Sequence, residues 1–434
     1  MQIAIYGIFL LLGIVLAVVL AIGVMDVVRG TPITSVGSPG EQTCCPATED
    51  PAFREHMELL THVDLDPGHE IDLFINGDQT YPRLWEDLRG AKTSITLQLY
   101  YCNKGRMAEE ISGILIERAR AGVEVYFLYD AFGTTLDDVY FDKLRAAGVK
   151  ARPFRPLSFQ SLQKAQHRAH IRVVVVDGII GYTGGFGIDD KWYGTGRQEG
   201  QWRDTNVRFT GPAVRQLQAT FIVCWAEASG NLLTGEKLLP EATRPEEDSG
   251  DRVAAGLLHA SPTVGSTSAE RFFALSTASA REKIYLSNSY FVPGRAFRTF
   301  LCDAAKRGVD VRILTVCGKS DVKSTWYAGR ARYEELLGGG VRIFEYQPAM
   351  MHAKSLVVDG VWSAVGSMNA DNRSMSFNEE SNLMMLDPDI GQRMEKIFVE
   401  DLEYSEEILL ESFKKRGWRP RVAEKACYLV RRVL

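Results

Sequence analysis

The stretch that decides the fold is Met351–Glu380, MHAKSLVVDGVWSAVGSMNADNRSMSFNEE. It carries the series His352, Lys354, Asp359, Ser367 and Asn369 in the spacing H-x-K-x4-D-x6-G-S-x-N. Side chains two residues apart point to the same face of an extended strand. We therefore expect His352 and Lys354 to project together.

The remainder of the stretch predicts a β-hairpin. The apolar run at 356–358 is typical of a strand buried on both faces. Asp359-Gly360 is a hairpin-turn signal, and residues 361–365 are predicted to form the returning strand. Gly366-Ser367 would then place small groups and backbone N–H donors beside the two basic side chains. A histidine, a lysine and N–H donors on one hairpin predict a site for a phosphate.

This stretch resembles the second HKD motif of the phospholipase D superfamily. The run Asp371-Asn372-Arg373-Ser374 and the pair Asn378-Glu379 are similar to the bacterial cardiolipin synthase-like branch. If the chain carried only one copy of the motif, the alternative would be an ordinary buried hairpin in which the histidine is hydrogen-bonded and the lysine reaches the surface. A second copy in the chain decides between the two interpretations.

Residues 170–187 supply that second copy. His170 and Arg172 precede a valine run, Asp177-Gly178 and then Gly184-Gly185. Two positions depart from the family pattern, with Arg172 in place of lysine and Gly187 in place of asparagine. Arginine keeps the charge and can bind a phosphate through two N–H groups, although it is bulkier. His167 is an alternative histidine, but only His170 has the matching spacing to Asp177.

The elements before the two motifs also repeat. In the first half the pattern predicts strands at 94–101, 123–128 and 149–154, with helices at 107–121 and 141–147. In the second half it predicts a strand at 283–288, helices at 297–306 and 333–338, and strand starts after Gly308 and Gly340. The β-α-β-α-β order indicates a mainly parallel sheet flanked by helices. Two unrelated hairpins would not be preceded by the same order of elements twice.

The resemblance implies an α/β fold of two tandem phospholipase D-like α-β-α sandwich repeats related by pseudo-two-fold symmetry, with one site between them. It implies six catalytic residues: His170, Arg172, Asp177, His352, Lys354 and Asp359. It also implies that Gly184, Gly185, Ser367 and Asn369 bind the substrate phosphate, and that neither a metal nor another cofactor takes part.

The resemblance assigns roles to these residues. His170 would attack phosphorus and carry a phosphatidyl group, while His352 would act as the acid and base. Arg172 and Lys354 would offset the charge on the phosphoryl oxygens. Asp177 and Asp359 would orient the imidazoles. The near-symmetry of the two motifs leaves the choice of nucleophile open on the residues alone.

The amino terminus predicts a membrane anchor. Ile3–Met25 is uncharged and apolar, and a helix of that length can cross the hydrocarbon core of a bilayer. A secretory signal peptide is the rival, but no basic region precedes the run and no small-x-small cleavage site follows it. The expected organisation is therefore a transmembrane helix at 1–28, a linker at 29–52, a first repeat at 53–240, a linker at 241–255, a second repeat at 256–400 and a basic helical tail at 401–434.

The net charge and the cysteine content argue against some classes of protein. The net charge of −5 argues against a dedicated nucleic-acid binder. The seven cysteines form no C-x-x-C pair and no regular framework, which argues against a disulfide scaffold and against structural zinc. The basic run at 414–421 fits either a segment lying on anionic lipid or a solvated surface helix.

The resemblance, together with the apolar amino terminus, implies a phosphatidyltransferase in the bacterial cell membrane, with a single membrane pass, that forms cardiolipin-type lipids from phospholipids such as phosphatidylglycerol. The sidedness and the oligomeric state stay open. A phospholipase D that hydrolyses phospholipids to phosphatidic acid and a nuclease are alternatives with the same chemistry. An inactive membrane scaffold is a further alternative, prompted by Arg172 and Gly187.

Overall fold

The structure is a computed structural model that describes residues 32–37, 45–156, 167–241, 253–263 and 265–431, together with positions 6, 7, 10, 13 and 17. Most of the expected anchor at Ile3–Met25 lies outside the described residues, as does most of the expected linker at 241–255. Within the part of the chain that is described, no helix has both the length and the apolar character needed to cross a membrane.

The first half of the chain contributes helices and the strands of one half of the main sheet. They are α2 (Pro51–Thr61), β1 (Asp66–Ile75), α3 (Asn76–Gly90), β2 (Ser94–Leu99), α4 (Arg106–Arg120), β3 (Glu124–Asp130), α5 (Asp138–Ala146), β4 (Lys150–Phe154), β5 (Val173–Val176), β6 (Ile180–Gly184), β8 (Thr205–Thr210) and α6 (Ala213–Ser229). The short strand β7 (Trp202–Arg203) lies outside the main sheet.

The second half follows the same plan. Its elements are β9 (Val253–Ala260), α7 (Ser268–Ser279), β10 (Lys283–Asn288), α8 (Arg295–Lys306), β11 (Asp310–Val316), α9 (Lys323–Arg330), α10 (Tyr333–Gly338), β12 (Arg342–Tyr346), β13 (Met350–Met351), β14 (Lys354–Val358), β15 (Trp362–Gly366), α11 (Asn372–Ser376), β16 (Glu380–Leu386), α12 (Pro388–Leu402), β17 (Ser405–Ile408), α13 (Leu410–Lys414) and α14 (Trp418–Leu429).

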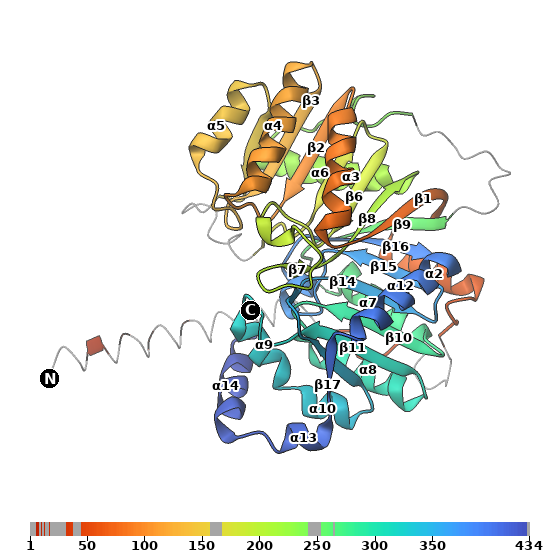
Figure 1. The fold of residues 1–434 in the computed structure, drawn as a ribbon. Coiled ribbons are helices and arrows are strands. Elements are labelled where there is room, and N and C mark those ends of the chain that lie inside the picture. Colours follow the sequence, from red (N-terminus) through yellow and green to blue (C-terminus); the bar gives the residue numbers. More distant parts are fainter. Residues whose placement is uncertain are drawn as a thin grey trace.

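Among the described residues one mixed sheet of 15 strands runs through both halves, in the order β17-β12-β11-β10-β14-β15-β16-β9-β1-β8-β6-β5-β2-β3-β4. Strands β2, β3 and β4 are parallel, and so are β10, β11 and β12. The predicted β-α-β-α-β order is therefore confirmed in both halves. Figure 1 shows the two halves one above the other, with helices packed on the strands of each.

Both motif hairpins form as predicted. Strand β5 pairs with β6, and β14 pairs with β15, each antiparallel. The turn residues Asp177 and Gly178 have φ values of 53° and 68°, and Asp359 and Gly360 have 53° and 67°. Positive φ at both central positions is the geometry of a two-residue hairpin turn that matches the twist of the strands.

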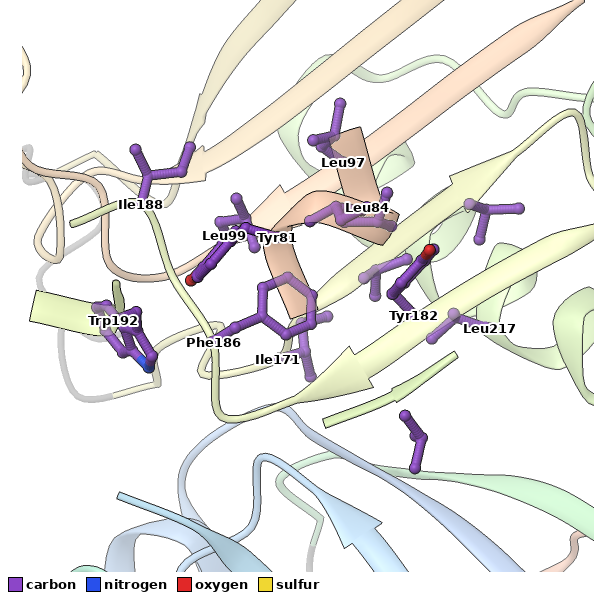
Figure 2. Packing of buried hydrophobic residues seen from close by; sticks show 14 of the residues in the cluster. Tyr81, Leu84, Leu97, Leu99, Ile171, Tyr182, Phe186, Ile188, Trp192 and Leu217 are labelled. Carbon is purple, nitrogen blue, oxygen red and sulfur yellow. The ribbon is translucent and has the colours of Figure 1, made fainter. Parts of the chain in front are cut away.

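Apolar side chains from helix, strand and loop fix the first hairpin in place. In Figure 2 the side chains of Tyr81 and Leu84 on α3 lie near Leu97 and Leu99 on β2 and near Ile171, which precedes β5. All five are buried. Burial of this kind contributes about 1.5–3 kcal/mol per large side chain, so the segment before β5 is held rigidly against the sheet.

Two sequence predictions differ from the structure. The expected first repeat begins at residue 53, but Phe53 on α2 packs on Trp362 of β15 with ring centroids 5.1 Å apart, so this helix packs with the second half. Residues 401–413 were expected to be helical, but α12 ends at Leu402 and β17 follows. Strand β17 pairs antiparallel with β12 and satisfies the backbone groups that this strand would otherwise expose.

Candidate active site

The two motif histidines lie just before strands β5 and β14, where the halves of the sheet meet. His170 is 8% exposed and His352 is 3% exposed. Residues next to them bridge the halves, since Ala169 forms a parallel bridge with Glu379, and β13 pairs with β7. The structure therefore brings both predicted histidines to one buried region.

A glutamate from the second half holds the histidine of the first half. The Nδ1 atom of His170 lies 3.0 Å from Oε1 and 3.1 Å from Oε2 of Glu380. The hydroxyls of Ser367 and Ser374 also donate to Glu380, at 2.5 and 2.6 Å. The serine hydroxyls fix the carboxyl group, and the carboxyl group fixes the imidazole.

An aspartate from the first half holds the histidine of the second half. The Nδ1 atom of His352 lies 3.0 Å from Oδ2 of Asp204, which also accepts a hydrogen bond from the Trp192 indole at 2.8 Å. The backbone N–H of Thr205 donates to the other oxygen of Asp204 at 2.9 Å. Asp204 is fully buried. Each histidine thus depends on a carboxyl group of the opposite half.

The two carboxyl groups occupy equivalent places in the two halves. Gly184 of β6 pairs with Asn206 of β8, and Gly366 of β15 pairs with Asn382 of β16. Asp204 and Glu380 each stand two residues before that asparagine. Sequence reasoning missed both acids. The available signal was an acidic residue at the start of β16 and another immediately before β8, each downstream of a motif hairpin.

Asp177 and Asp359 do not contact the histidines, so their predicted role is wrong. Asp177 accepts hydrogen bonds from the backbone N–H groups of residues 92–94, at 2.7 to 3.1 Å. Asp359 accepts from those of residues 281–283, each at 2.8 Å. Both carboxylates sit in the hairpin turns, at the far end of their strands from the histidines, and tie each turn to the start of β2 or β10.

The two basic motif residues lie buried beside the histidines. Arg172 is 1% exposed and donates to the carbonyl oxygens of His170 and Phe186, at 2.5 and 3.2 Å. Lys354 is also 1% exposed and donates to the carbonyl oxygen of His352. Burial lowers the pKa of Arg172 and lowers the pKa of Lys354 to about 7, and the nearby Arg172 cation adds to the effect on Lys354.

The predicted phosphate-binding residues serve partly in packing. The N–H of Gly185 donates to the Asn206 side chain at 3.0 Å, and the N–H of Ser367 donates to the carbonyl of Ser381 at 2.9 Å. These two N–H groups are therefore engaged within the protein, contrary to the expectation. A Cβ at Gly184 would lie 2.2 Å from the Asn206 side chain, so close packing requires glycine there.

Gly187 and Asn369 show how the two motifs diverge. A Cβ at Gly187 would lie 2.9 Å from the Tyr101 carbonyl oxygen and 3.0 Å from the Trp192 ring. The packing of Trp192 therefore leaves no room for the asparagine that the family pattern has at this position. In the second motif Asn369 is present and buried, and its side-chain oxygen accepts from the Ser289 hydroxyl at 2.8 Å.

Burial lowers the pKa of both imidazoles. It holds the pKa of His170 well below its ordinary value, and the cations of Arg172 and Lys354 act in the same direction. For His352, burial and the Lys354 ammonium lower the pKa to about 3, against the opposing effect of Asp204. Both histidines are therefore neutral near pH 7, and each retains a ring nitrogen with a lone pair.

The two carboxyl groups differ in charge. Burial raises the pKa of Glu380 to about 8, so this acid holds a proton at neutral pH. Burial also acts to raise the pKa of Asp204, but the His352 imidazole and the Lys354 ammonium outweigh it and leave the pKa below its ordinary value. His352 therefore faces a carboxylate, and His170 faces an acid that is mostly neutral.

This arrangement combines two imidazoles and two buried cations in one place. The chemistry it suits is attack on a phosphorus atom and proton transfer to an oxygen. Among the described residues no group of three histidine, cysteine, aspartate or glutamate side chains is placed to hold a metal ion.

Comparison with known proteins agrees with this geometry. The family model described as "Cardiolipin synthase, PLD-like domain" matches residues 276–402. The chain is 35% identical to a cardiolipin synthase of Geobacillus kaustophilus (strain HTA426) over 358 residues, which cover 82% of this chain and 70% of that protein. It is 36% identical to one of Geobacillus sp. (strain WCH70) over 394 residues, covering 88% of this chain and 78% of that protein.

Among solved structures, a phosphatidylserine synthase of Haemophilus influenzae Rd KW20 is similar with a TM-score of 0.67. It is 13% identical in sequence, and the match covers 88% of this chain and 100% of that one. At this identity the likeness concerns the fold alone.

Proposed function

Because this chain belongs to the cardiolipin synthase family of phospholipase D-like proteins, we propose that it moves a phosphatidyl group between alcohols through a covalent phosphohistidine. It is a phospholipid-modifying enzyme of the phosphatidyltransferase type, with phosphatidylglycerol as its substrate and a cardiolipin-type lipid as its product. The chain consists of two tandem phospholipase D-like repeats related by a pseudo-two-fold axis, which the matched strand order of the two halves supports.

The observation that carries the proposal is the crossed pairing of His170 with Glu380 and of His352 with Asp204. A carboxyl group at Nδ1 fixes the ring and leaves Nε2 as the reactive nitrogen. Because each pair joins both halves, neither half alone makes a complete site. Two oriented imidazoles are what a two-step displacement at phosphorus requires.

In the first step Nε2 of His170 attacks the phosphorus atom of a phosphatidylglycerol. The P–N bond forms as the P–O bond to the glycerol headgroup breaks, and His352 gives its proton to the departing oxygen. The negative charge of the bound phosphodiester offsets the cations that lower the pKa of His352, so the imidazole can carry this proton.

In the second step His352 takes the proton of an incoming hydroxyl. The hydroxyl of a second phosphatidylglycerol forms the new P–O bond, and the P–N bond electrons return to His170. Cardiolipin and one glycerol are the products. Arg172 and Lys354 stabilise the charge on the phosphoryl oxygens, and the Asn369 amide adds a further donor beside them.

The difference between the two carboxyl groups supports this division of roles. An ionised Asp204 stabilises the imidazolium form of His352, which an acid and base must adopt. A neutral Glu380 makes His170 less basic and therefore a better leaving group from phosphorus in the second step. The geometry is otherwise near-symmetric.

The protein works at the bacterial cell membrane, held by a single span at residues 3–25. Helix α14 at the other end of the chain is suited to the same surface. Its Trp418, Val422 and Leu429 are exposed, beside Arg419 and Lys425. Exposed tryptophan next to basic residues favours the headgroup layer of an anionic bilayer.

The purified full-length protein with labelled phosphatidylglycerol vesicles tests the function. Cardiolipin and glycerol are the expected products. Phosphatidic acid instead would show a hydrolase that uses water as the acceptor, and absence of turnover by a folded protein would show a scaffold. A labelled adduct trapped on His352 but never on His170 would overturn the assignment of roles, and full lipid exchange by His352→Ala would overturn the mechanism.

A further inference from the structure

A tyrosine and an aspartate lie on the His352 side of the site and have no role in the mechanism above. The Tyr290 hydroxyl donates to Oδ1 and Oδ2 of Asp321, at 2.8 and 3.0 Å. The Tyr290 ring lies 6.4 Å from the His352 ring, edge to face. Asp321 itself is exposed, in the loop between β11 and α9. The Asp321 carboxylate is therefore exposed to solvent on the His352 side of the site, and the hydrogen bond from the Tyr290 hydroxyl fixes its position.

The tyrosine at the equivalent position in the first half contacts a group of the opposite charge. Ser287 pairs with Ser355 and Gln98 pairs with Val173, which makes Tyr101 the counterpart of Tyr290. The Tyr101 hydroxyl lies 3.4 Å from Nζ of Lys191. Two equivalent tyrosines thus contact an ammonium in one half and a carboxylate in the other, which adds a further difference between the two halves of the site.

The ammonium and the carboxylate both lie on the His352 side of the site. Lys191 lies 5.3 Å from the Trp202 ring, whose centroid lies 4.6 Å from that of His352. Asp321 acts electrostatically on Lys191 and on Lys354. Within the described part of the chain, however, Lys191 and Asp321 are not joined by an ion pair within 4.0 Å. A polar group of a substrate can lie between them.

A carboxylate at this place is unsuited to phosphate, because like charges repel. It is suited to hydroxyl groups, from which a carboxylate accepts strong hydrogen bonds. Among the described residues Tyr290 is the one hydrogen-bond donor to Asp321, so lone pairs on both carboxylate oxygens stay available. The chemistry of the pair therefore selects a neutral, hydroxyl-rich group.

We propose that Asp321, positioned by Tyr290, binds the second hydroxyl of the acceptor alcohol and selects vicinal diols such as a glycerol headgroup. This inference rests on the proposed function, in which His352 takes the proton of the reacting hydroxyl. As one hydroxyl gives its proton to His352 and attacks phosphorus, the neighbouring hydroxyl donates to Asp321. A monohydric alcohol or water can react but cannot make the second contact.

The test compares two acceptors on the same enzyme. Phosphatidyl transfer from labelled phosphatidylglycerol to 1,2-propanediol and to 1-propanol is measured as the ratio of the two kcat/KM values. A hydrogen bond to a charged group corresponds to a preference for the diol of about tenfold to a hundredfold. Asp321→Asn is expected to reduce that ratio to within about threefold of unity, and Tyr290→Phe to reduce it by a smaller factor.

The matched control is a second tyrosine–aspartate pair, on strands β10 and β11, which precede Tyr290 and Asp321. The Tyr285 hydroxyl donates to Asp310 at 3.2 Å, at the opposite end of β10 from Tyr290. Asp310→Asn is expected to keep both rates and their ratio at the wild-type values. An Asp321→Asn enzyme that keeps the wild-type ratio, or a wild-type enzyme that shows no preference for the diol, would refute the subsite.

These outcomes are distinct from failure of the proposed function. If the wild-type protein forms no cardiolipin and transfers no phosphatidyl group to either alcohol, the transferase mechanism fails and the subsite fails with it. If it forms cardiolipin but transfers no phosphatidyl group to the diol, the subsite alone is wrong. If transfer proceeds through His170 but the ratio does not depend on residue 321, the mechanism stands and the subsite alone is wrong.

Discussion

Replacing Asp204 by asparagine tests the crossed pairing most directly. Oδ2 of Asp204 faces two N–H donors, the Trp192 indole and Nδ1 of His352, while Oδ1 faces the N–H of Thr205. An amide NH2 in either position meets a donor. The imidazole can relieve the conflict only by moving its proton from Nδ1 to Nε2, which removes the lone pair that accepts the proton of the incoming hydroxyl.

The expected loss is large because the wrong tautomer is fixed by the fold. Loss of the buried carboxylate partner of a catalytic histidine lowers kcat by about 10³- to 10⁴-fold, or about 4–5.5 kcal/mol of transition-state stabilisation. The buried donor left without a partner lowers the free energy of unfolding by about 1–3 kcal/mol. The variant is therefore expected to fold and to bind lipid while turning over very slowly.

Glu380→Gln is the matched variant. Burial keeps Glu380 mostly protonated at neutral pH, so a neutral glutamine replaces a neutral acid. We expect a loss in kcat of about ten- to a hundredfold, smaller than for Asp204→Asn, because one hydrogen bond changes and no charge is removed. The assay is the rate of cardiolipin formation from labelled phosphatidylglycerol vesicles, with quenched-flow detection of the labelled His170 adduct and thermal unfolding as the check on folding.

Two results would refute this reasoning. A folded Asp204→Asn enzyme that retains more than a tenth of the wild-type kcat would show that Asp204 does not set the tautomer of His352. Equal losses in the two variants would show that the carboxyl groups do not differ in charge, and the assignment of His352 as acid and base would lose its support.

Three further predictions concern single positions. Asp359→Ala is expected to lower the free energy of unfolding by about 3 kcal/mol in denaturant melts, because three backbone N–H donors lose their acceptor and the positive-φ turn loses its aspartate. The kcat of the folded enzyme is expected to stay at the wild-type value, and a large loss of kcat would contradict the structural role. The pKa of Lys354, about 7, predicts that kcat/KM falls about tenfold per pH unit above that value, since only the charged ammonium stabilises the phosphoryl oxygens. Lys354→Arg should move this decrease in kcat/KM to higher pH, and an unchanged pH profile would assign the decrease to another group. Gly187→Asn should lower the thermal midpoint, with a loss of about 1–3 kcal/mol in the free energy of unfolding, because the Cβ of the new asparagine would lie too close to the Trp192 ring. A variant with a higher thermal midpoint would contradict this packing.

Local sequence patterns determined much of this protein. The Asp-Gly turns, the buried apolar runs and the alternation of strands with helices depend on neighbouring residues, and apart from the helix expected at 401–413 each was found where it was predicted. The spacing of His170 to Arg172 and of His352 to Lys354 also places each pair together without reference to the rest of the chain. The departure at position 187 was visible in the sequence, but its cause, the ring of Trp192, was not.

Only the tertiary structure decided which groups act on the histidines. The aspartate within each motif is the first acid that follows the histidine in sequence, but it lies across the length of a strand and binds backbone N–H groups. The acids that hold the rings are 210 residues from His170 and 148 residues from His352. Such contacts depend on how the two halves of the sheet meet, which local periodicity does not encode. The sequence determined the reactive side chains, and the meeting of the two halves decided their orientation and charge.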